Sequence, residues 1–381
     1  MAAGRWAGAV VRTVRRLLYR DIVWSVAFVA VAFLSLFFFI DFVDELDNVG
    51  RNGFTLLHAA IAATLEVPGH LYELSPICVL IGTIYAMARL AQSSEYTILR
   101  TGGLGPVRAL GLLALLGLFF GAVTFVVGDY LSPLSEREAV QLKASFRGGL
   151  ALGSTGAWLK ERRAGPDGER AISINVARTA ANGELEGIRI FEQDSDGRLR
   201  TRIDARRARV DADSVWQLAD VERTDWPTPE QAAAGAEVRV QRHATVRWPS
   251  SLSASVVAAA VLPLSTMSTA ELWRYSAHLG DQEQASQRQE ILFWKRALYP
   301  FACLVMVALA LPFAYLHARA GGLSLKVFGG IMLGISFVLL NNVSGHLGML
   351  RNWAPWVAAS APGLVYLALS LAAFTWLVRF R

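Results

Sequence analysis

Six long apolar stretches constrain this chain more than any other feature of its sequence. The 381 residues are 54% hydrophobic and only 18% charged. A stretch of about 20 apolar residues is long enough to cross a bilayer as a helix. The sequence therefore predicts an integral membrane protein with six spans, at Ile22–Ile40, Leu74–Ala88, Ala109–Gly128, Ala297–Leu316, Val327–Leu347 and Ala354–Val378.

The second of these spans is the shortest. It needs Leu71, Tyr72 and Leu90 at its ends, or a locally thinner bilayer, to cross. The preceding segment, Asp41–Glu73, is rich in acidic residues and is predicted to be an outside loop. Within that loop, Leu56–Leu65 is expected to lie on the surface as a short amphipathic helix.

Basic residues beside the spans predict the orientation of the chain. With the N-terminus inside, twelve Lys and Arg residues of the short flanks lie in the cytoplasm, against Arg51 and Arg351 outside. Cytoplasmic flanks of membrane proteins carry an excess of positive charge. We therefore expect both termini in the cytoplasm. The formal net charge of +6 is explained by this orientation and not by a nucleic-acid partner.

Between the third and fourth spans lies an insert, from about Leu131 to Trp294, which must fold in water outside. Several of its segments alternate apolar and polar residues, as strands with one buried face do. Short strands of this kind predict a sandwich or jellyroll. The strands are expected at Ala171–Val176, Gly187–Glu192, Arg198–Asp204, Ala208–Asp211, Val215–Val221 and Glu237–Trp248, with turns at Asp167-Gly168, Asn182-Gly183 and Asp196-Gly197.

The period of two assigns the residues of these strands to two faces. The residues of a common interior are Ile172, Ile174, Val176, Ile188 and Ile190. The residues of the opposite, wet face are Arg200, Arg202, Arg207 and Arg209. For these arginines a solvated face and a ladder that binds phosphate both remain open.

The end of the insert leads back to the membrane through helices. The segment Val256–Leu264 is too short to span and contains Pro263, so it is expected to be a buried connector. Ser268 and Glu271 have the spacing of a capping box. They predict a helix through about Leu279, and a second helix is expected to lead from Gln284 into the fourth span.

The polar segment Arg89–Arg108, between the second and third spans, has the features of a short docking helix. Ser93 or Ser94 can cap a helix whose first turn carries Glu95, and two glycines then end it. About two turns are too few to be stable alone in water, so the helix is expected to dock in a groove of a partner. An ordinary loop between membrane helices remains the alternative.

The sequence offers no catalytic machinery. It contains no GxxxxGK[ST] string, so the chain does not bind ATP through a P-loop. The six histidines show no paired ligand spacing, and Cys78 and Cys303 both lie in apolar stretches. We therefore expect a protein that is not an enzyme, with no catalytic residue, no metal ligands and no cofactor of its own.

Three strings carry a resemblance to a known family. They are FVDELDNVG at Phe42–Gly50, LAQSSEYTILRTGG at Leu90–Gly103 and FWKRALYPFACLVMVALALPFA at Phe293–Ala314. In this order and spacing, the chain resembles over essentially its whole length the LptF/LptG permeases of the lipopolysaccharide exporter, and most closely the LptG branch. The resemblance implies an α-helical membrane protein of the bacterial inner membrane, with six transmembrane helices and a periplasmic β-jellyroll between the third and fourth.

The resemblance also implies how the exporter is driven. A coupling helix at about 91–103 docks on an LptB-like ATPase dimer, which uses ATP and Mg. In that helix Glu95 pairs with a basic residue of the ATPase, and the other residues of the contact are Tyr96, Ile98, Leu99 and Arg100. The remaining partners are an LptF-like permease, an LptC-like single-span protein and an LptA-like periplasmic bridge.

The substrate implied by the resemblance is lipopolysaccharide, extracted from the outer leaflet of the inner membrane and passed to the bridge. The residues expected to meet it are Phe33, Phe37, Arg296, Ile172, Ile174, Ile188 and Ile190. The chain then divides into residues 1–131 with the first three spans, residues 132–266 with the jellyroll, and residues 267–381 with the connecting helices and the last three spans.

One departure from the family concerns the outer end of the first span. Family members often carry basic residues there to meet lipid phosphates, whereas this chain has Asp41, Asp44, Glu45 and Asp47. Phosphate binding there requires cations from the partner or a divalent metal that bridges the acids. Three alternatives for the whole chain stay open, namely the LptF-like paralogue of the same exporter, a membrane-anchored scaffold or binding protein, and a secondary transporter.

Overall fold

The structure is a computed structural model, and it divides the chain into two compact units. It describes residues 2–93, 95, 98, 105–147, 150–151, 156–165, 168–179, 184–211, 215–250, 252, 266–281, 287–315 and 322–379. The membrane unit comprises Met1–Asp44, Ala63–Ser135 and Gln287–Arg381, and the sheet unit comprises Glu45–Ala62 and Glu136–Ser286.

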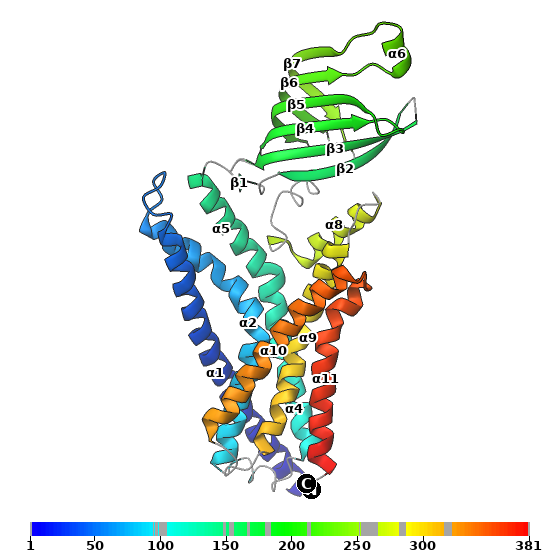
Figure 1. Cartoon of the computed structure of the whole chain (residues 1–381). Coiled ribbons are helices and arrows are strands. Elements are labelled where there is room, and N and C mark those ends of the chain that lie inside the picture. The colour runs from blue at the N-terminus through cyan, green and yellow to red at the C-terminus, as the bar shows by residue number, and fades with distance from the viewer. Residues whose placement is uncertain are drawn as a thin grey trace. The chain divides into compact units, whose positions relative to one another are not determined.

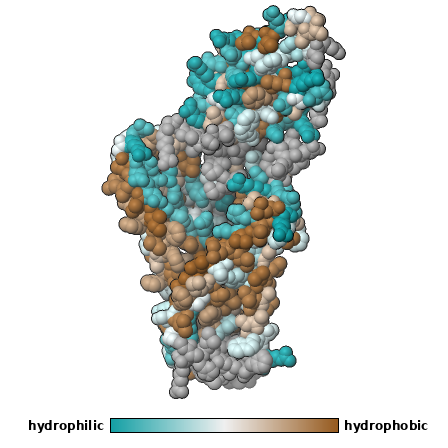
Figure 2. Space-filling view, in the orientation of Figure 1, coloured by the Kyte–Doolittle hydropathy of each residue, from teal (hydrophilic) through white to brown (hydrophobic). Residues whose placement is uncertain are grey.

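Six helices among the described residues are long and apolar enough to cross a membrane, which confirms the predicted number of spans. They are α1 (Ala2–Leu46), α2 (Leu56–Gln92), α4 (Pro106–Val126), α9 (Gln287–Tyr315), α10 (Leu323–Leu350) and α11 (Pro355–Arg379). Figure 1 shows the start of α1 and the end of α11 at the same end of the bundle. In Figure 2, hydrophobic residues cover most of the visible surface of these helices, as expected for a surface that faces lipid.

The second span differs from its prediction. Instead of a surface helix followed by a short span, one continuous helix runs from Leu56 to Gln92, and only residues 47–55 separate it from α1. Pro68 and Pro76 lie inside this helix. The predictions that Leu56–Leu65 is separate and that Asp41–Glu73 is a loop were therefore wrong. Neighbouring membrane helices and local adjustments stabilise a helix around a proline that would break it in water.

The third span also continues further than predicted. After α4 comes one turn of π-helix, η1 (Val127–Leu131), and then α5 (Ser132–Arg147), which occupies the start of the predicted insert. In the sheet unit, the ring of Phe146 from α5 lies 5.3 Å from that of Phe54 and 4.5 Å from that of His58. Lys143 of α5 forms an ion pair with Glu45 at 2.7 Å. These contacts hold an amphipathic helix that the strand pattern did not predict.

Glycines allow the membrane helices to approach closely. A Cβ atom on Gly117 would lie 2.8 Å from the Cα of Leu304, and one on Gly121 would lie 2.9 Å from the carbonyl oxygen of Pro300. Both contacts join α4 to α9. Close backbone approach through small residues is a main source of association between helices in a bilayer, where lipid removes the hydrophobic driving force.

The sheet unit contains a seven-stranded antiparallel sheet between α5 and the last three spans. Its strands are β1 (Leu150–Ala151), β2 (Ala157–Gly165), β3 (Gly168–Thr179), β4 (Leu185–Gln193), β5 (Leu199–Val210), β6 (Val215–Asp225) and β7 (Arg239–Pro249), with the short α6 (Pro229–Ala233) before β7. From β3 to β7 each strand pairs with the next, while β1 and β2 both pair with β3. Figure 1 shows one curved sheet. The predicted fold class, a helical membrane protein with an inserted jellyroll-like domain, is confirmed.

The two faces of the sheet are as predicted. The five residues of the expected interior are at most 2% exposed and belong to one core that includes Trp216 and Trp248. On the other face, Arg200 pairs with Asp194 at 3.2 Å and Arg202 pairs with Asp204 at 2.7 Å. Partnered arginines are typical of a solvated face and not of a ladder of free phosphate ligands.

An irregularity in β5 explains why this single strand was predicted as two strands; we call it the crease. The segments Arg198–Asp204 and Ala208–Asp211 both belong to β5, where Arg206 and Arg207 are both exposed between buried Ala205 and Ala208. On the neighbouring strands, Gly187 and Asp220 have the positive φ angles of +65° and +52° at the same level of the sheet. Two consecutive outward residues break the period of two, which the sequence pattern cannot distinguish from a loop.

The capping box is confirmed at the start of α8 (Thr269–Asp281). Glu271 Oε2 accepts hydrogen bonds from the Ser268 amide at 2.8 Å and from Arg137 at 2.5 Å. The turn at Asp196-Gly197 is also present, with Gly197 at a φ of +76°. The predicted connector Val256–Leu264, the turn at Asn182-Gly183 and the helix start at Gln284 lie outside the described residues.

Protonation of Glu271 is expected to weaken its contacts with Ser268 and Arg137, which join the start of α8 to α5. Partial burial raises the pKa of Glu271, but hydrogen bonds from Ser268 and the charge of Arg137 outweigh it and hold the pKa below its usual value. The stabilisation is therefore complete above the unfolded pKa and is lost as the pH falls through the folded pKa. We expect Glu271→Gln to lower the thermal midpoint at pH 7, and the difference from wild type to shrink below about pH 4. A difference that does not change with pH would contradict the assignment.

Candidate functional site

Between α2 and residue 105, the structure describes Ser93, Glu95 and Ile98. Glu95 and Ile98 are helical and exposed, and the Ile98 side chain is 67% exposed. The hydroxyl of Ser93 donates a hydrogen bond to the Leu90 carbonyl oxygen at 3.3 Å, which satisfies one of the last carbonyl groups of α2. The structure of Ser94, Tyr96, Leu99 and Arg100 lies outside the described residues.

An ion pair fastens α1 to α2 just before this segment. Arg89 donates to Asp21 at 2.7 Å, and the Asp21 carboxylate is only 14% exposed. Further along the same two helices, a Cβ on Gly82 would lie 2.6 Å from the backbone of Val26. The end of α2 that leads into this segment is therefore in direct contact with α1. This pair could not be predicted from the sequence, since the two residues are 68 positions apart and no sequence pattern links them.

Most of α1 is bare. Only 6% of its most apolar window is buried, and Trp24 and Phe28 are 72% and 75% exposed. Between α1 and α4 lies a groove of about 970 Å³ with apolar walls, in which Arg15, Arg16 and Arg20 take part. Apolar walls beside guanidinium groups suit a lipid with an anionic headgroup. A membrane helix with so little protein contact presents a surface for lipid or for another membrane chain.

The two predicted lipid residues of α1, Phe33 and Phe37, are both half-buried and lie four residues apart on one face of the helix. Phe33 is half-buried against the core of the membrane unit, and Phe37 is half-buried with its ring 4.8 Å from that of His70. Phe39, in contrast, is 63% exposed. Phe33 and Phe37 therefore help to pack α1, and the exposed aromatic surface is provided by other residues.

Arg296, the predicted phosphate ligand, takes part in the packing of the membrane unit. It donates to the carbonyl oxygen of Gly128 at 2.7 Å, and its guanidinium carbon lies 5.7 Å from the centre of the Tyr72 ring. Gly128 belongs to η1, and a Cβ there would overlap the Tyr72 ring. The π-turn thus supplies a carbonyl oxygen to Arg296. The adjacent Lys295 donates to the carbonyl oxygen of Asn341 at 2.5 Å.

The interior isoleucines of the sheet are fully packed. Ile172, Ile174, Ile188 and Ile190 are 0–2% exposed and lie in the same core as Trp216. They form part of a continuous apolar core inside the sheet unit. An acyl chain that reached them would have to displace the side chains that cover them.

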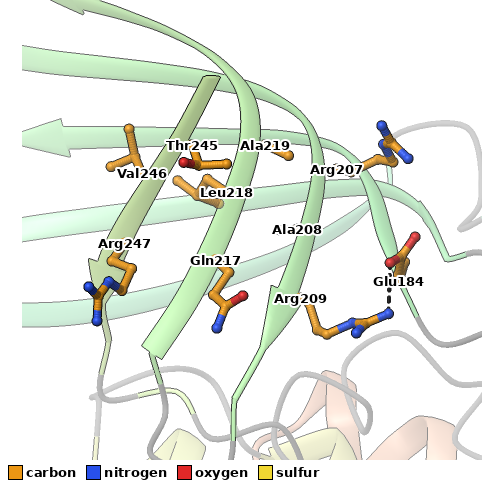
Figure 3. Close-up of a pocket in the computed structure, with 10 residues that line it drawn as sticks. All are labelled: Glu184, Arg207, Ala208, Arg209, Gln217, Leu218, Ala219, Thr245, Val246 and Arg247. Atoms are coloured by element: carbon orange, nitrogen blue, oxygen red, sulfur yellow. Dashed lines mark hydrogen bonds and ion pairs between the residues drawn. The ribbon is translucent and has the colours of Figure 1, made fainter. Parts of the chain in front are cut away.

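A hollow of about 590 Å³ lies on the sheet over β5, β6 and β7. Figure 3 shows Arg207, Arg209 and Arg247 around it, with the hydrogen bond between Arg209 and Glu184. That bond measures 2.9 Å. The small side chain of Ala219 leaves the space open. Three guanidinium groups and one carboxylate give the hollow a net positive charge that favours an anionic group.

The acids at the end of α1 have different surroundings. Glu45 is 8% exposed and binds Lys143, while Asp44 and Asp47 are exposed. Asp41 is half-buried and lies 2.7 Å from the imidazole of His70. Asp41 is therefore the acid that another membrane helix engages directly.

Comparisons with known proteins cover nearly the whole chain. The family model described as lipopolysaccharide export system permease LptF/LptG matches residues 16–376. The lipopolysaccharide export system permease protein LptG of Escherichia coli K12 is 26% identical over 341 residues, which cover 89% of this chain and 91% of the relative. The protein of the same name from Haemophilus influenzae is 23% identical over 363 residues, 94% of this chain and 97% of the relative.

Proposed function

The chain belongs to the LptF/LptG family of lipopolysaccharide export permeases, and we propose that it is the LptG-type membrane subunit of an exporter driven by ATP hydrolysis in a separate subunit. It extracts lipopolysaccharide from the outer leaflet of the inner membrane and passes it towards the outer membrane. The single observation that carries this proposal is the match over residues 16–376, which spans both the helices and the inserted sheet.

The bare surface of α1 supports a second permease in the membrane. Large side chains such as Trp24, Phe28 and Phe39 are more than 60% exposed along this helix. Two related permeases that face each other through such helices would enclose a cavity for lipid, with apolar walls for the acyl chains. An LptF-like chain is the partner that fits this surface of α1, and an LptC-like single-span protein would bind to the same surface.

The segment at Glu95 and Ile98 supports a cytoplasmic ATPase as the source of energy. Ile98 is exposed, and Arg89 connects the end of α2 to α1 through Asp21. Closure of an LptB-like ATPase dimer around ATP and Mg would move the segment, and the movement would reach α1, which borders the cavity. ATP and Mg belong to that partner, and this chain contributes no catalytic residue.

The end of the sheet supports a bridge outside the membrane. β7 is the last strand in the order of the sheet. Val238 just before it and Val240 within it are 48% and 58% exposed. A terminal strand offers unpaired backbone groups to which another chain can add a strand. An LptA-like periplasmic bridge that extended the sheet here would continue its apolar interior towards the outer membrane.

The orientation of the chain is a prediction that labelling can check. In a background with Cys78→Ala and Cys303→Ala, Ser93→Cys and Asp196→Cys place single thiols at exposed sites. In intact spheroplasts, we expect a membrane-impermeant maleimide to label residue 196 and not residue 93. Lysis should then expose residue 93. If both thiols react from the same side, the proposed topology is wrong.

A further inference from the structure

Three possible metal ligands meet between α1 and α2 in the membrane unit. Asp41 comes from α1, whereas Glu66 and His70 both come from α2. One ligand atom from each lies within 4.8 Å of the other two, and Asp41 Oδ2 and His70 Nε2 are 2.7 Å apart. Ligand atoms that share one first-row metal ion at about 2.0–2.2 Å lie roughly 3.0–3.5 Å apart. Small rotations of the three side chains would therefore bring them around one ion.

The backbone that holds these residues is suited to a metal site. Glu66 and His70 are four residues apart on one helix, so their side chains project from the same face, one turn above the other. Asp41 faces them from the second helix. Ligands that are fixed by two helices are held more firmly than ligands on a loop, which reduces the entropy lost when an ion binds.

The surroundings restrict the three side chains further. The Asp41 and His70 side chains are 14% and 21% exposed, so they are largely withdrawn from water while an ion can still reach them. The Phe37 ring packs on the imidazole at 4.8 Å and limits its rotation. Both features favour ligands that are oriented before the ion arrives.

We propose that Asp41, Glu66 and His70 bind one divalent transition-metal ion of the Mn²⁺ or Zn²⁺ type. Imidazole with two carboxylates is a donor set that such ions accept, while Ca²⁺ prefers oxygen alone. Three protein ligands leave at least one coordination position open. A phosphate oxygen of the lipid headgroup can take that position, and this second part of the inference rests on the proposed function. The ion would then supply the positive charge that Asp41 itself cannot offer to a phosphate.

The experiment measures Mn²⁺ binding to the purified full chain in detergent, from the electron paramagnetic resonance signal of the free ion. No lipid, ATP or partner is present. We expect about one ion per chain, and about a ten-fold or greater loss of affinity in Asp41→Asn, Glu66→Gln and His70→Phe. Asp44→Asn is the matched control, because it removes an exposed carboxylate from the same helix. It should bind within about two-fold of wild type, as expected for a surface charge away from the ligands.

Two results would overturn the metal site. Wild type that binds no Mn²⁺ or Zn²⁺ at millimolar concentration would leave only a hydrogen bond between His70 and Asp41. An equal loss in Asp44→Asn and in the three ligand variants would indicate nonspecific attraction to an acidic surface. The thermal midpoint of each variant, measured without metal, shows whether the fold is intact. Because no transport is measured, neither result bears on the export proposal.

A second arm of the experiment tests the role of the open position. Purified lipopolysaccharide and inorganic phosphate are added separately to the Mn²⁺-loaded chain. If a lipid phosphate completes the coordination, lipopolysaccharide should tighten Mn²⁺ binding in wild type more than in Asp41→Asn, and inorganic phosphate should act more weakly. Equal tightening in both chains would show that the lipid binds the ion by itself and would overturn this second part.

Discussion

Replacement of Glu95 by lysine is expected to stop export. Glu95 is exposed and helical, and Ile98 lies exposed one turn further along the same segment. If Glu95 faces a cation of the ATPase, Glu95→Lys places two like charges together at a contact from which water is partly excluded. Such a juxtaposition costs several kcal/mol, and about 1.4 kcal/mol is already a ten-fold loss of affinity. The ATPase should no longer co-purify with the permease.

Graded variants separate repulsion from loss of the helix. Glu95→Ala removes the attraction without adding repulsion, so its effect should be smaller. An acid in place of the ATPase cation should partly restore assembly and export with Glu95→Lys. Co-purification and ATP-dependent lipid release are measured for all four combinations of the two chains. If Glu95→Lys assembles and exports normally, Glu95 does not meet a cation, although docking through Ile98 would still stand.

The second large effect is expected at the contact between α4 and α9. Gly117→Val and Gly121→Val each place a branched side chain where a Cβ alone would lie 2.8–2.9 Å from the backbone of α9. The two helices must separate, since a backbone atom cannot rotate away as a side chain can. Overpacking of this kind costs about 1–3 kcal/mol at each position. The double variant is expected to lose the folded membrane unit in detergent.

Gly111→Val is the matched control for this prediction. Gly111 lies on the same helix, and a Cβ there would meet no atom within 4 Å. The thermal midpoint of the purified chain, followed by fluorescence-detected gel filtration, should fall for the two contact variants and stay near that of wild type for Gly111→Val. Equal midpoints for Gly111→Val and Gly121→Val would show that the close approach of α4 and α9 does not stabilise the unit.

The sequence was sufficient to predict the number of spans and the type of insert. Both depend on composition and period, which are local properties. The errors in the helices concern where they begin and end, because contacts with other elements decide this. The acidic residues of Asp41–Glu73 indicated a loop, although α2 begins at Leu56 and runs without a break to Gln92. Residues 127–147 continue the third span as η1 and α5, because contacts such as the one between Lys143 and Glu45 stabilise an exposed amphipathic helix.

The strands were predicted where the alternation is regular. β2 was missed because its segment, AWLKERRAG, carries four charged residues in a row, although Leu159 and Glu161 are both buried. β5 was predicted as two strands because Arg206 and Arg207 are both exposed, which shifts the alternation of buried and exposed residues by one position. In both cases the partner strands decide the structure, and a single segment does not contain that information.

The candidate site was the least predictable part. The interior isoleucines followed from the period of two, but the partners of Arg89, Asp41 and Arg296 did not. Each lies on another element, at Asp21, His70 and Gly128. Pairs of this kind depend on how helices cross, which is not written in the period of either helix. The roles of Tyr96, Leu99 and Arg100 remain predictions from the resemblance alone.

We propose that this chain moves lipopolysaccharide when a separate ATPase hydrolyses ATP. The most direct measurement reconstitutes the chain, its permease partner and the ATPase in liposomes loaded with lipopolysaccharide, and follows transfer of the lipid to a soluble periplasmic acceptor. We expect ATP-dependent transfer that disappears when this chain is omitted or carries Glu95→Lys. Two results would contradict this proposal. One is lipid transfer that continues without this chain, and the other is an assembled complex that hydrolyses ATP but transfers no lipid.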